Sequence, residues 1–461
     1  MTLASYVRSL RGKRVAVVGI GVSNLPLLSL LAQEGINVTA HDRRGEEALG
    51  ESAPALKRLG VKLELGETYL DRLDADVIFR TPGLHPFTPQ LLEAQRRGAV
   101  LTSEMEAFFA VCPCMTICVT GSDGKTTTTS VIARLLETEG RTVHLGGNIG
   151  RPLLTETPAF RPEDIAVLEL SSFQLHSMVC SPDVAVVTNI SPNHLDIHPS
   201  FEDYVDAKRR IFIGQGRDGV LVLNRDNAIT RSFAPEARGK VLFFSREETV
   251  RDGVFLRDGV IRAAADGAVE DILPASEILL PGLHNAENYM AAFCAVRGLV
   301  SRETMREVAR TFQGVAHRLE LIRVRRGVRY VNDSIASSPT RTIAGLRSFQ
   351  TKPILIAGGY DKHIPFDELG REINLRVKAL FLTGYTSEKI RRAVVSDPGY
   401  DPQKLPVAVL DDFRETVLAA SRAAREGDVV LLSPACASFD KFKNFEERGD
   451  TFRNIVLGLE E

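Results

Sequence analysis

The segment at residues 115–140, MTICVTGSDGKTTTTSVIARLLETEG, restricts the possible folds of this chain more than any other part of its sequence. A β-branched run at residues 116–120 predicts a buried strand, and apolar residues recur at helical spacing after a glycine-rich turn. The N–H groups of the loop, Gly121-x-x-Gly124-Lys125-Thr126, would converge on an anion at the positive end of the helix. Lys125 would add a cation for the outer phosphates, and the Thr126 hydroxyl would bind a metal ion on them. The segment therefore predicts an α/β sheet with a site for a nucleoside triphosphate.

The loop is shorter than the common phosphate-loop motif, because Val119 stands where that motif has its first glycine. The alternative interpretation is an ordinary strand-to-helix turn that carries an exposed lysine. Two glycines followed by Lys-Thr-Thr, directly between a strand and a helix, favour the phosphate site.

Composition limits the class of protein. A length of 461 residues predicts about three domains, and contents of 44% apolar and 25% charged residues are typical of soluble globular proteins. The net charge of −2 provides no basic field for nucleic acid, and no apolar run predicts membrane insertion. There is no signal-peptide pattern, and the six cysteines lie mostly in apolar runs. We expect a cytoplasmic enzyme that acts on small-molecule substrates, and we expect it to be a monomer.

The first 103 residues predict a Rossmann-like sheet. A strand at residues 14–19 opens on GIGVSN, and the next strand, residues 38–42, ends on Asp42. Asn24 replaces the third glycine of a dinucleotide fingerprint, which favours some other nucleotide. A further strand ends in Thr81-Pro82-Gly83, which is either a simple turn or, at the carboxyl end of a strand, part of a ligand site.

In the second domain, polar residues follow or end several apolar strands. Glu169 lies in the apolar run AVLELSS, where a carboxylate needs a partner, either Mg²⁺ beside the phosphates or a core ion pair. His194 follows another strand and is either a ligand or a satisfied loop histidine. Residues 241–280 alternate short β runs with turns and predict a small antiparallel appendage.

Lys208 falls on the apolar stripe of the predicted helix FEDYVDAKRRIF. It either extends its amine out to solvent or turns inward toward the metal site. A buried amine can lose its proton and become a nucleophile. After Gly314, strands and helices alternate again, which predicts a third parallel sheet with crossover helices. The predicted domains are residues 1–103, 104–313 and 314–461.

Ten segments in order make the chain recognisable. They are TGSDGKTTT, GGNIG, LELSSFQL, ISPNHLD, YVDAK, GLHNAEN, HRLE, NDSIASSP, AGGYDK and LLSPACASFDKFKNFEERG. Their order and spacing resemble the Mur ligase superfamily over essentially the whole chain, and the last segment resembles the branch that adds D-glutamate.

The resemblance implies an α/β protein of three domains: a Rossmann-like N-terminal sheet, a P-loop-type central ATPase sheet with a small β appendage, and a Rossmann-like C-terminal sheet. It implies an ADP-forming ligase of peptidoglycan synthesis that joins D-glutamate to UDP-N-acetylmuramoyl-L-alanine through an acyl phosphate. It also implies a C-terminal domain that swings shut, which would exclude water from that intermediate.

The family's residue roles transfer to matching positions. The implied catalytic residues are Lys125, His194 and Lys208. The implied ATP contacts are Gly121, Ser122, Asp123, Gly124, Lys125, Thr126, Thr127, Asn285, Arg318 and Asp333. Two Mg²⁺ ions would be held by Thr126, Glu169, His194 and Lys208, the last as a carbamate formed with CO₂. The implied UDP-substrate residues are Gly21, Val22, Asp42, Arg43, Arg44, Thr81, Pro82, Gly83, Asn148 and Ser171. The implied D-glutamate residues are His194, Lys362, Ser438, Phe439 and Phe445.

The sequence departs from the family pattern at two places. Ile335 stands where the family often has lysine, so Arg341 or Lys362 would have to supply the missing cation. Asn24 and Pro26 make the first loop less glycine-rich than in relatives.

Three other functions account for only some of these features. A sibling ligase or a folylpolyglutamate synthase-like ligase would add a different amino acid, and the C-terminal segment argues against both. A nicotinamide-dependent oxidoreductase would account for GIGVSN and Asp42 but leaves the loop at residues 121–126 without a role. A non-catalytic nucleotide-binding regulator would not need Lys208.

Overall fold

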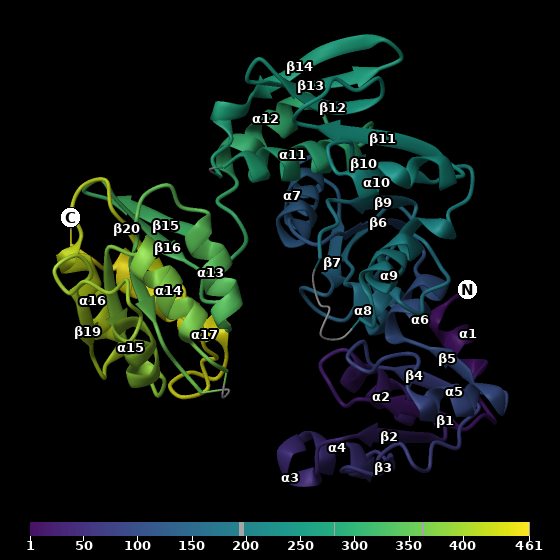
Figure 1. The fold of residues 1–461 in the computed structure, drawn as a ribbon. Coiled ribbons are helices and arrows are strands. Elements are labelled where there is room, and N and C mark those ends of the chain that lie inside the picture. Colours follow the sequence, from purple (N-terminus) through teal and green to yellow (C-terminus); the bar gives the residue numbers. More distant parts are fainter. Residues whose placement is uncertain (193–197, 281, 362–363, 461) are drawn as a thin grey trace. The chain divides into compact units, whose positions relative to one another are not determined.

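The computed structural model describes residues 1–192, 198–280, 282–361 and 364–460. The chain divides into two compact units, Met1–Phe312 and Gln313–Glu461 (Figure 1). Each contains α/β layers, and the three predicted sheets are confirmed. Within the described residues, no helix is both long and apolar enough to cross a bilayer.

The N-terminal sheet has five parallel strands in the order β3-β2-β1-β4-β5. Strands β1, β2 and β4 match the three expected from the sequence to within a residue or two. The strands are β1 Val15–Val18, β2 Val38–Asp42, β3 Lys62–Leu65, β4 Val77–Arg80 and β5 Val100–Thr102. The helices are α1 Leu3–Arg8, α2 Asn24–Gln33, α3 Glu46–Leu49, α4 Ser52–Arg58, α5 Pro89–Arg96 and α6 Glu104–Val111.

The central sheet has nine strands in the order β14-β13-β12-β11-β10-β9-β6-β8-β7. Its inner strands are buried on both faces, which explains why they are continuous apolar runs. The strands are β6 Met115–Thr120, β7 Val143–Gly147, β8 Ile165–Glu169, β9 Val184–Val187, β10 Val220–Asn224, β11 Lys240–Ser245, β12 Gly253–Arg257, β13 Val260–Ala265 and β14 Ala268–Pro274. The helical segments are α7 Lys125–Thr138, η1 Leu154–Ala159, α8 Ser172–Leu175, α9 Phe201–Ile213, α10 Ala228–Ser232, η2 Ala234–Glu236, η3 Ala275–Glu277, α11 Leu283–Ala295 and α12 Arg302–Thr311.

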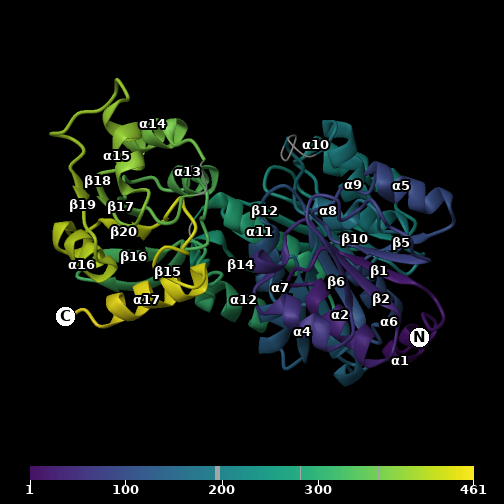
Figure 2. The same ribbon diagram turned by 90° about the horizontal axis from the view of Figure 1, so that it is seen from below.

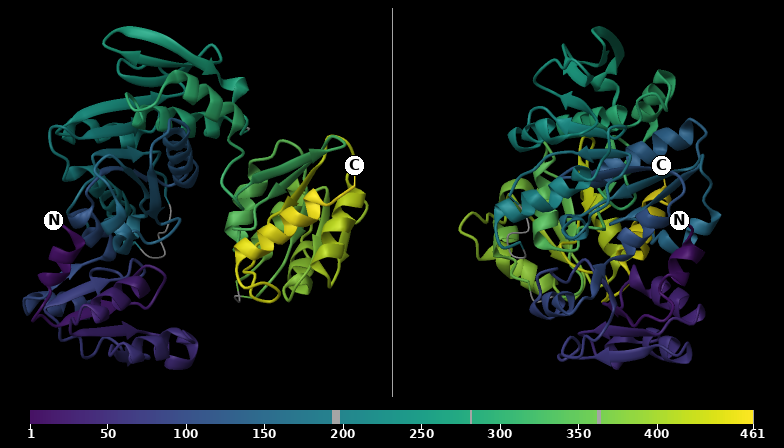
Figure 3. Two further views of the ribbon diagram at one scale, coloured as in Figure 1. Left: turned by 180° about the vertical axis from the view of Figure 1, so that it is seen from behind. Right: turned by 90° about the vertical axis from the view of Figure 1, so that its right-hand side faces the viewer.

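The β appendage is part of this sheet rather than a separate layer. β11 and β12 continue it in parallel, and the antiparallel pairings are β12 with β13 and β13 with β14 at its far edge (Figure 3). The expectation of an antiparallel appendage is therefore right for the last two strands and wrong for LFFS, which lies in β11 and pairs in parallel with the core strand β10.

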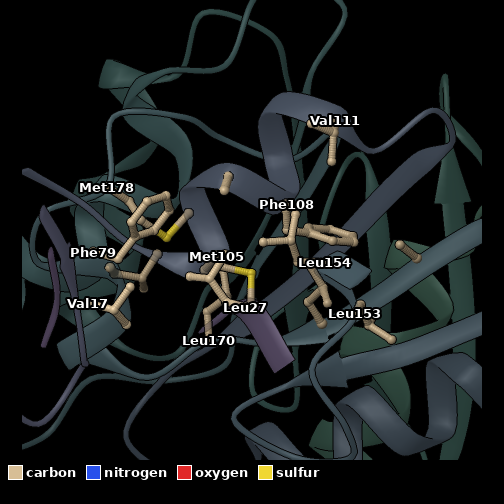
Figure 4. Close-up of a cluster of buried hydrophobic side chains, with 14 of the residues drawn as sticks. Val17, Leu27, Phe79, Met105, Phe108, Val111, Leu153, Leu154, Leu170 and Met178 are labelled. Atoms are coloured by element: carbon tan, nitrogen blue, oxygen red, sulfur yellow. The ribbon is translucent and has the colours of Figure 1, made fainter. Parts of the chain in front are cut away.

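Two helical layers cover the central sheet. α7, α11 and α12 pack on one face, and α6 and α9 pack on the other (Figure 2). The apolar core beneath α6 and α9 also includes side chains of the N-terminal domain, among them Val17 and Phe79 from its sheet and Leu27 from α2 (Figure 4). Because this apolar core is continuous, residues 1–312 form a single unit.

The second unit contains a six-stranded sheet in the order β15-β16-β20-β17-β18-β19, parallel except for β15. α13, α14 and α15 cover one face, and α16 and α17 cover the other. The strands are β15 Glu320–Arg325, β16 Val328–Asn332, β17 Ile354–Ala357, β18 Ala379–Leu382, β19 Val407–Val409 and β20 Val429–Leu432. The helices are α13 Pro339–Arg347, α14 Asp367–Arg376, α15 Ser387–Val395, α16 Phe413–Ala423 and α17 Phe445–Leu457.

Candidate active site

The loop between β6 and α7 depends on its two glycines. Gly121 has φ +149°, and a Cβ there would lie 1.9 Å from Thr188 Oγ1. Gly124 has φ +78°, and its Cβ would lie 2.2 Å from Asn288 Oδ1. A Cβ at either position would force the neighbouring side chain to shift, and both φ values lie in the region that glycine favours, so the glycines let the backbone lie close to its neighbours.

The segment after β9 holds the loop in shape. The Ser122 amide donates to the Asn189 carbonyl at 2.8 Å, and the Asp123 amide donates to Asn189 Oδ1 at 2.9 Å. Thr188 Oγ1 donates to the Asp123 carbonyl at 2.6 Å. These bonds leave the loop preorganised at the first turn of α7, where N–H groups and the helix dipole favour an anion.

Lys125 begins α7, and its Nζ donates to the carbonyls of Gly121 and Ser122 at 2.9 and 3.0 Å. Thr126, the next residue, is buried in the same turn. The structure therefore excludes the exposed lysine of an ordinary turn.

Lys208 is turned inward. Its side chain on α9 is 1% exposed, and its Nζ donates to the Gly121 carbonyl at 2.7 Å and to Thr120 Oγ1 at 3.4 Å. The amine lies 4.7 Å from the centre of the Tyr204 ring. Burial, together with the charge of Lys125, holds the pKa of this amine well below its usual value. The solvent-directed alternative for Lys208 is wrong.

Glu169 ends β8, where it pairs in register with Val119 beside the start of the loop. One carboxylate oxygen accepts from Asn148 Nδ2 at 2.7 Å. The other, Oε2, is buried without a hydrogen-bond partner among the described residues. A buried carboxylate oxygen without a donor is costly, and a hard divalent cation would satisfy it. The Glu169 carboxylate therefore fits a hard divalent cation such as Mg²⁺.

Asn285 lies in the first turn of α11. Its Oδ1 accepts from Asn288 Nδ2 at 3.2 Å, and Asn288 in turn contacts the loop at Gly124 and accepts from Thr128. The expected ATP residue Asn285 is thus linked to the loop through one side chain.

Ser171 caps α8 rather than presenting a free hydroxyl. Its Oγ donates to Gln174 Oε1 at 2.9 Å and accepts from the Gln174 amide. This capping box gives Ser171 a local structural role beside the substrate role that the resemblance implies.

The expected nucleotide-substrate residues of the first domain form two groups. Asp42 accepts from the amides of Ile20 and Arg44 and from the Arg44 guanidinium. Burial alone would raise the pKa of Asp42, but these bonds lower it overall. Arg43 is exposed and pairs with Glu67. Gly21 and Val22 are exposed in the loop after β1.

The turn that contains Thr81, Pro82 and Gly83 follows β4 and is held by a residue that the sequence reasoning missed, Arg80. This arginine is 1% exposed, and it donates to the carbonyls of Thr81 and Pro82 at 3.1 and 3.2 Å and to that of Phe173 in α8 at 2.9 Å. Burial lowers its pKa to about 10. A charged residue ending the apolar strand VIFR is the signal that could have revealed it, by the same reasoning that identified Glu169.

The remaining described candidates lie in the second unit. Asp333 follows β16 and is buried; it accepts from Ser433 Oγ at 2.7 Å and from the Leu319 amide at 3.3 Å. Burial raises its pKa to about 7. Arg318 is one of the charges that oppose this rise. Ser438 is buried, Phe439 is 63% exposed, and Phe445 begins α17. His194 and Lys362 lie outside the described residues.

Three family models match the chain in order. They are described as "Mur ligase MurD-like, N-terminal domain" at residues 13–103, "Mur ligase middle domain" at 119–296 and "Mur ligase, glutamate ligase domain" at 317–436. The UDP-N-acetylmuramoylalanine–D-glutamate ligases of Acetivibrio thermocellus and Clostridium novyi are each 50% identical to this chain, and each match covers 99% of both chains.

Solved structures support the fold. The UDP-N-acetylmuramate–alanine ligase of Thermotoga maritima has a TM-score of 0.56 at 16% identity, with 96% of this chain and 99% of that chain covered. At such low sequence identity, the structural similarity is evidence for the fold only. The full-length identity to the curated relatives goes further, and with the three family models in order it shows that the chain belongs to the Mur ligase family.

Proposed function

We propose that this Mur ligase uses ATP to join D-glutamate to UDP-N-acetylmuramoyl-L-alanine. The names of its 50% identical relatives support the substrates. The observation that carries the chemistry is the burial of Lys208 and Glu169 beside one glycine loop, where one carboxylate oxygen of Glu169 has no hydrogen-bond donor in the described part of the chain.

A carboxylate is a poor acyl donor, because it would have to expel an oxide. Transfer of the terminal phosphoryl group of ATP to the L-alanine carboxylate yields an acyl phosphate and ADP. The D-glutamate amine then attacks the acyl carbon, forming the amide and releasing phosphate and a proton. This sequence gathers several negative charges in one place, so it requires positive groups arranged in advance.

The loop at residues 121–127 would cradle the ATP phosphates with its N–H groups, and Lys125 would exchange its two loop carbonyls for phosphate oxygens. Asn285, Arg318 and Asp333 would contact the rest of ATP. Glu169, Thr126 and His194 would hold Mg²⁺, which when bound would offset charge on the phosphates and polarise the transferred group.

Lys208 would react with CO₂ to form a carbamate. The nitrogen lone pair attacks the carbon of CO₂, an N–C bond forms, and the amine loses a proton, which leaves an anionic ligand. The depressed pKa supports this step, because the neutral amine is the nucleophile. Carbon-13 NMR in labelled bicarbonate should show a carbamate signal that is absent from the Lys208→Ala variant.

Residues of the first and central domains would bind the nucleotide substrate: Gly21, Val22, Asp42, Arg43, Arg44, Thr81, Pro82, Gly83, Asn148 and Ser171. The D-glutamate pocket would use His194, Lys362, Ser438, Phe439 and Phe445. The proposed enzyme has three domains, with boundaries at residues 103 and 313, and works in the cytoplasm as a monomer. Size-exclusion chromatography with light scattering would test whether it is a monomer.

The test is an ATP turnover assay with UDP-N-acetylmuramoyl-L-alanine present and one amino acid added at a time. D-glutamate should stimulate ADP release strongly, whereas L-glutamate, L-lysine and diaminopimelate should not. Stimulation by another of these amino acids would point to a sibling ligase, and the absence of stimulation by D-glutamate would overturn the proposal.

A further inference from the structure

A second cluster of ligand-type side chains lies where the N-terminal and central domains meet. His85 follows the turn after β4, His176 lies at the end of α8, and Asp203 lies in the first turn of α9. One ligand atom from each of these three residues lies within 4.8 Å of the other two. None of the three belongs to the phosphate loop or to the residues expected to hold Mg²⁺.

The hydrogen bonds of His176 leave one nitrogen ready to act as a ligand. Its Nε2 lies 2.9 Å from both carboxylate oxygens of Asp203, so the proton belongs on that nitrogen. Nδ1 then carries a lone pair, and it is buried without a hydrogen-bond partner among the described residues. The His176 side chain is only 6% exposed. A histidine whose other ring nitrogen donates to a carboxylate is the usual arrangement for metal ligation.

Asp203 is held in place by a second histidine. His198 Nδ1 lies 2.6 Å from Asp203 Oδ2, and His198 Nε2 lies 3.0 Å from Ser172 Oγ. Both nitrogens of His198 are therefore used, whereas His176 has one to spare. Asp203 thus acts mainly as an anchor that orients His176.

His85 supplies a second ring nitrogen that has no hydrogen-bond partner among the described residues. Its ring centre lies 5.0 Å from that of His176, and its Nε2 is buried without a described partner. Its Nδ1 accepts a 3.2 Å bond from the Phe87 amide. Because Nδ1 accepts this bond, the proton of the neutral ring lies on Nε2. A cation bound to Nε2 would displace that proton to Nδ1, and the long hydrogen bond from the Phe87 amide would be lost. Two buried nitrogens on neighbouring, edge-on rings that both lack a partner among the described residues cost more.

The donor set selects the kind of ion. Imidazole nitrogens suit Zn²⁺, Co²⁺ and Ni²⁺, whereas Mg²⁺ prefers oxygen ligands such as those at Glu169. The positive Arg80 nearby opposes any cation, and the negative Asp203 favours one. These opposing charges fit a metal site of moderate affinity. Water or a small solute would fill the remaining coordination positions of the ion.

We propose that His85 and His176 bind a divalent transition-metal ion such as Zn²⁺, with Asp203 orienting His176. The ion joins the turn after β4 to α8, and so fastens the N-terminal domain to the central domain. It is distinct from the Mg²⁺ of the ligase reaction, and its binding does not depend on the proposed ligase activity.

The experiment measures zinc binding to the full chain by equilibrium dialysis, after chelator treatment and in excess Mg²⁺. The wild type should bind one Zn²⁺ with moderate affinity and unfold at a higher temperature in its presence. His85→Gln and His176→Gln should each lose this ion and the thermal shift. Asp203→Asn should weaken binding by about 10–100-fold, the usual effect of removing a group that orients a ligand.

Two control variants separate this site from other zinc ligands. His144→Gln removes a histidine that also pairs with a carboxylate, Asp164, and Cys112→Ser removes one of two thiols 3.6 Å apart. Both should keep the bound ion. Retention of Zn²⁺ by either His85→Gln or His176→Gln, or its loss in Cys112→Ser, would overturn the proposal. His85 is only half-buried, so its variant remains informative if His176→Gln fails to fold.

Discussion

Each compact unit contains a pair made of a buried carboxylate at the carboxyl end of a parallel strand and a buried cationic side chain. In the first unit these are Glu169 and Lys208, and in the second they are Asp333 and Arg448. The two pairs are similarly buried, but their hydrogen bonding differs. Glu169 has one oxygen without a donor among the described residues, whereas Asp333 accepts from Ser433 Oγ and from a backbone amide.

The cations differ in the same way. Arg448 donates to Ser334 Oγ and to the carbonyls of Ser334, Cys436 and Ala437, at 2.8–3.1 Å. Lys208 has one short bond, to the Gly121 carbonyl, and one long bond, to a threonine hydroxyl. Buried polar groups that the protein satisfies itself stabilise the fold, and those it leaves unsatisfied await a ligand. Changes to the first pair should therefore mainly affect catalysis, and changes to the second should affect stability in addition to the ATP contact proposed for Asp333.

The largest effect is expected for Lys208→Ala. Ligase activity should fall by at least about a hundredfold, because an anionic metal ligand is lost while the fold remains. Short carboxylic acids such as acetate should restore part of the activity by occupying the vacated space. Arg209→Ala, next on α9 and paired at the surface with Glu236, is the matched control and should keep its activity. Equal activity in wild type and Lys208→Ala would show that the two buried pairs do not differ as argued.

Arg448→Met should instead destabilise the protein by about 3 kcal/mol, because three buried carbonyls and a hydroxyl lose their donor. Denaturant unfolding followed by fluorescence or circular dichroism measures this loss. Arg422→Met, an exposed arginine on α16, should change stability little. A stable Arg448→Met variant would contradict the assignment of this residue to the fold.

Much of this contrast could be predicted from the sequence, and part of it could not. Lys208 on an apolar stripe and Glu169 in an apolar strand were recognisable, because charge interrupts a strong hydrophobic period in both. Arg80 and Arg448 were missed. Arg448 lies in the polar run FEERGD, where nothing marks it as buried, and its four acceptors come from segments that meet only in the folded sheet. Likewise the cluster of His85, His176 and Asp203 depends on the meeting of two domains, which local patterns do not record.

Asp333 should give the second unit a pH-dependent stability. Burial raises its pKa from 3.8 to about 7, so the folded state keeps a proton that the unfolded state has released between these values. Stability should therefore fall as pH rises through this range, by about 3 kcal/mol between pH 5 and pH 8. Asp333→Asn cannot ionise and should lack this part of the slope. Parallel slopes for wild type and variant, measured by urea unfolding at several pH values, would show that Asp333 is ionised in the fold.

The smallest expected effect tests the role of Glu169 Oε2, the carboxylate oxygen that has no donor among the described residues. Mg²⁺ at ten times its dissociation constant should stabilise the wild type by about 1.4 kcal/mol, because it binds only the folded chain. Glu169→Gln should abolish this gain while unfolding normally without Mg²⁺, since the amide oxygen can still accept from Asn148. Glu104→Gln is the matched control, a buried carboxylate that accepts from the Leu154 amide, and it should keep the Mg²⁺ effect. If Mg²⁺ stabilises Glu169→Gln as much as the wild type, the oxygen without a donor does not bind the metal. The difference in hydrogen bonding between the two buried pairs would then not separate a ligand site from a structural site.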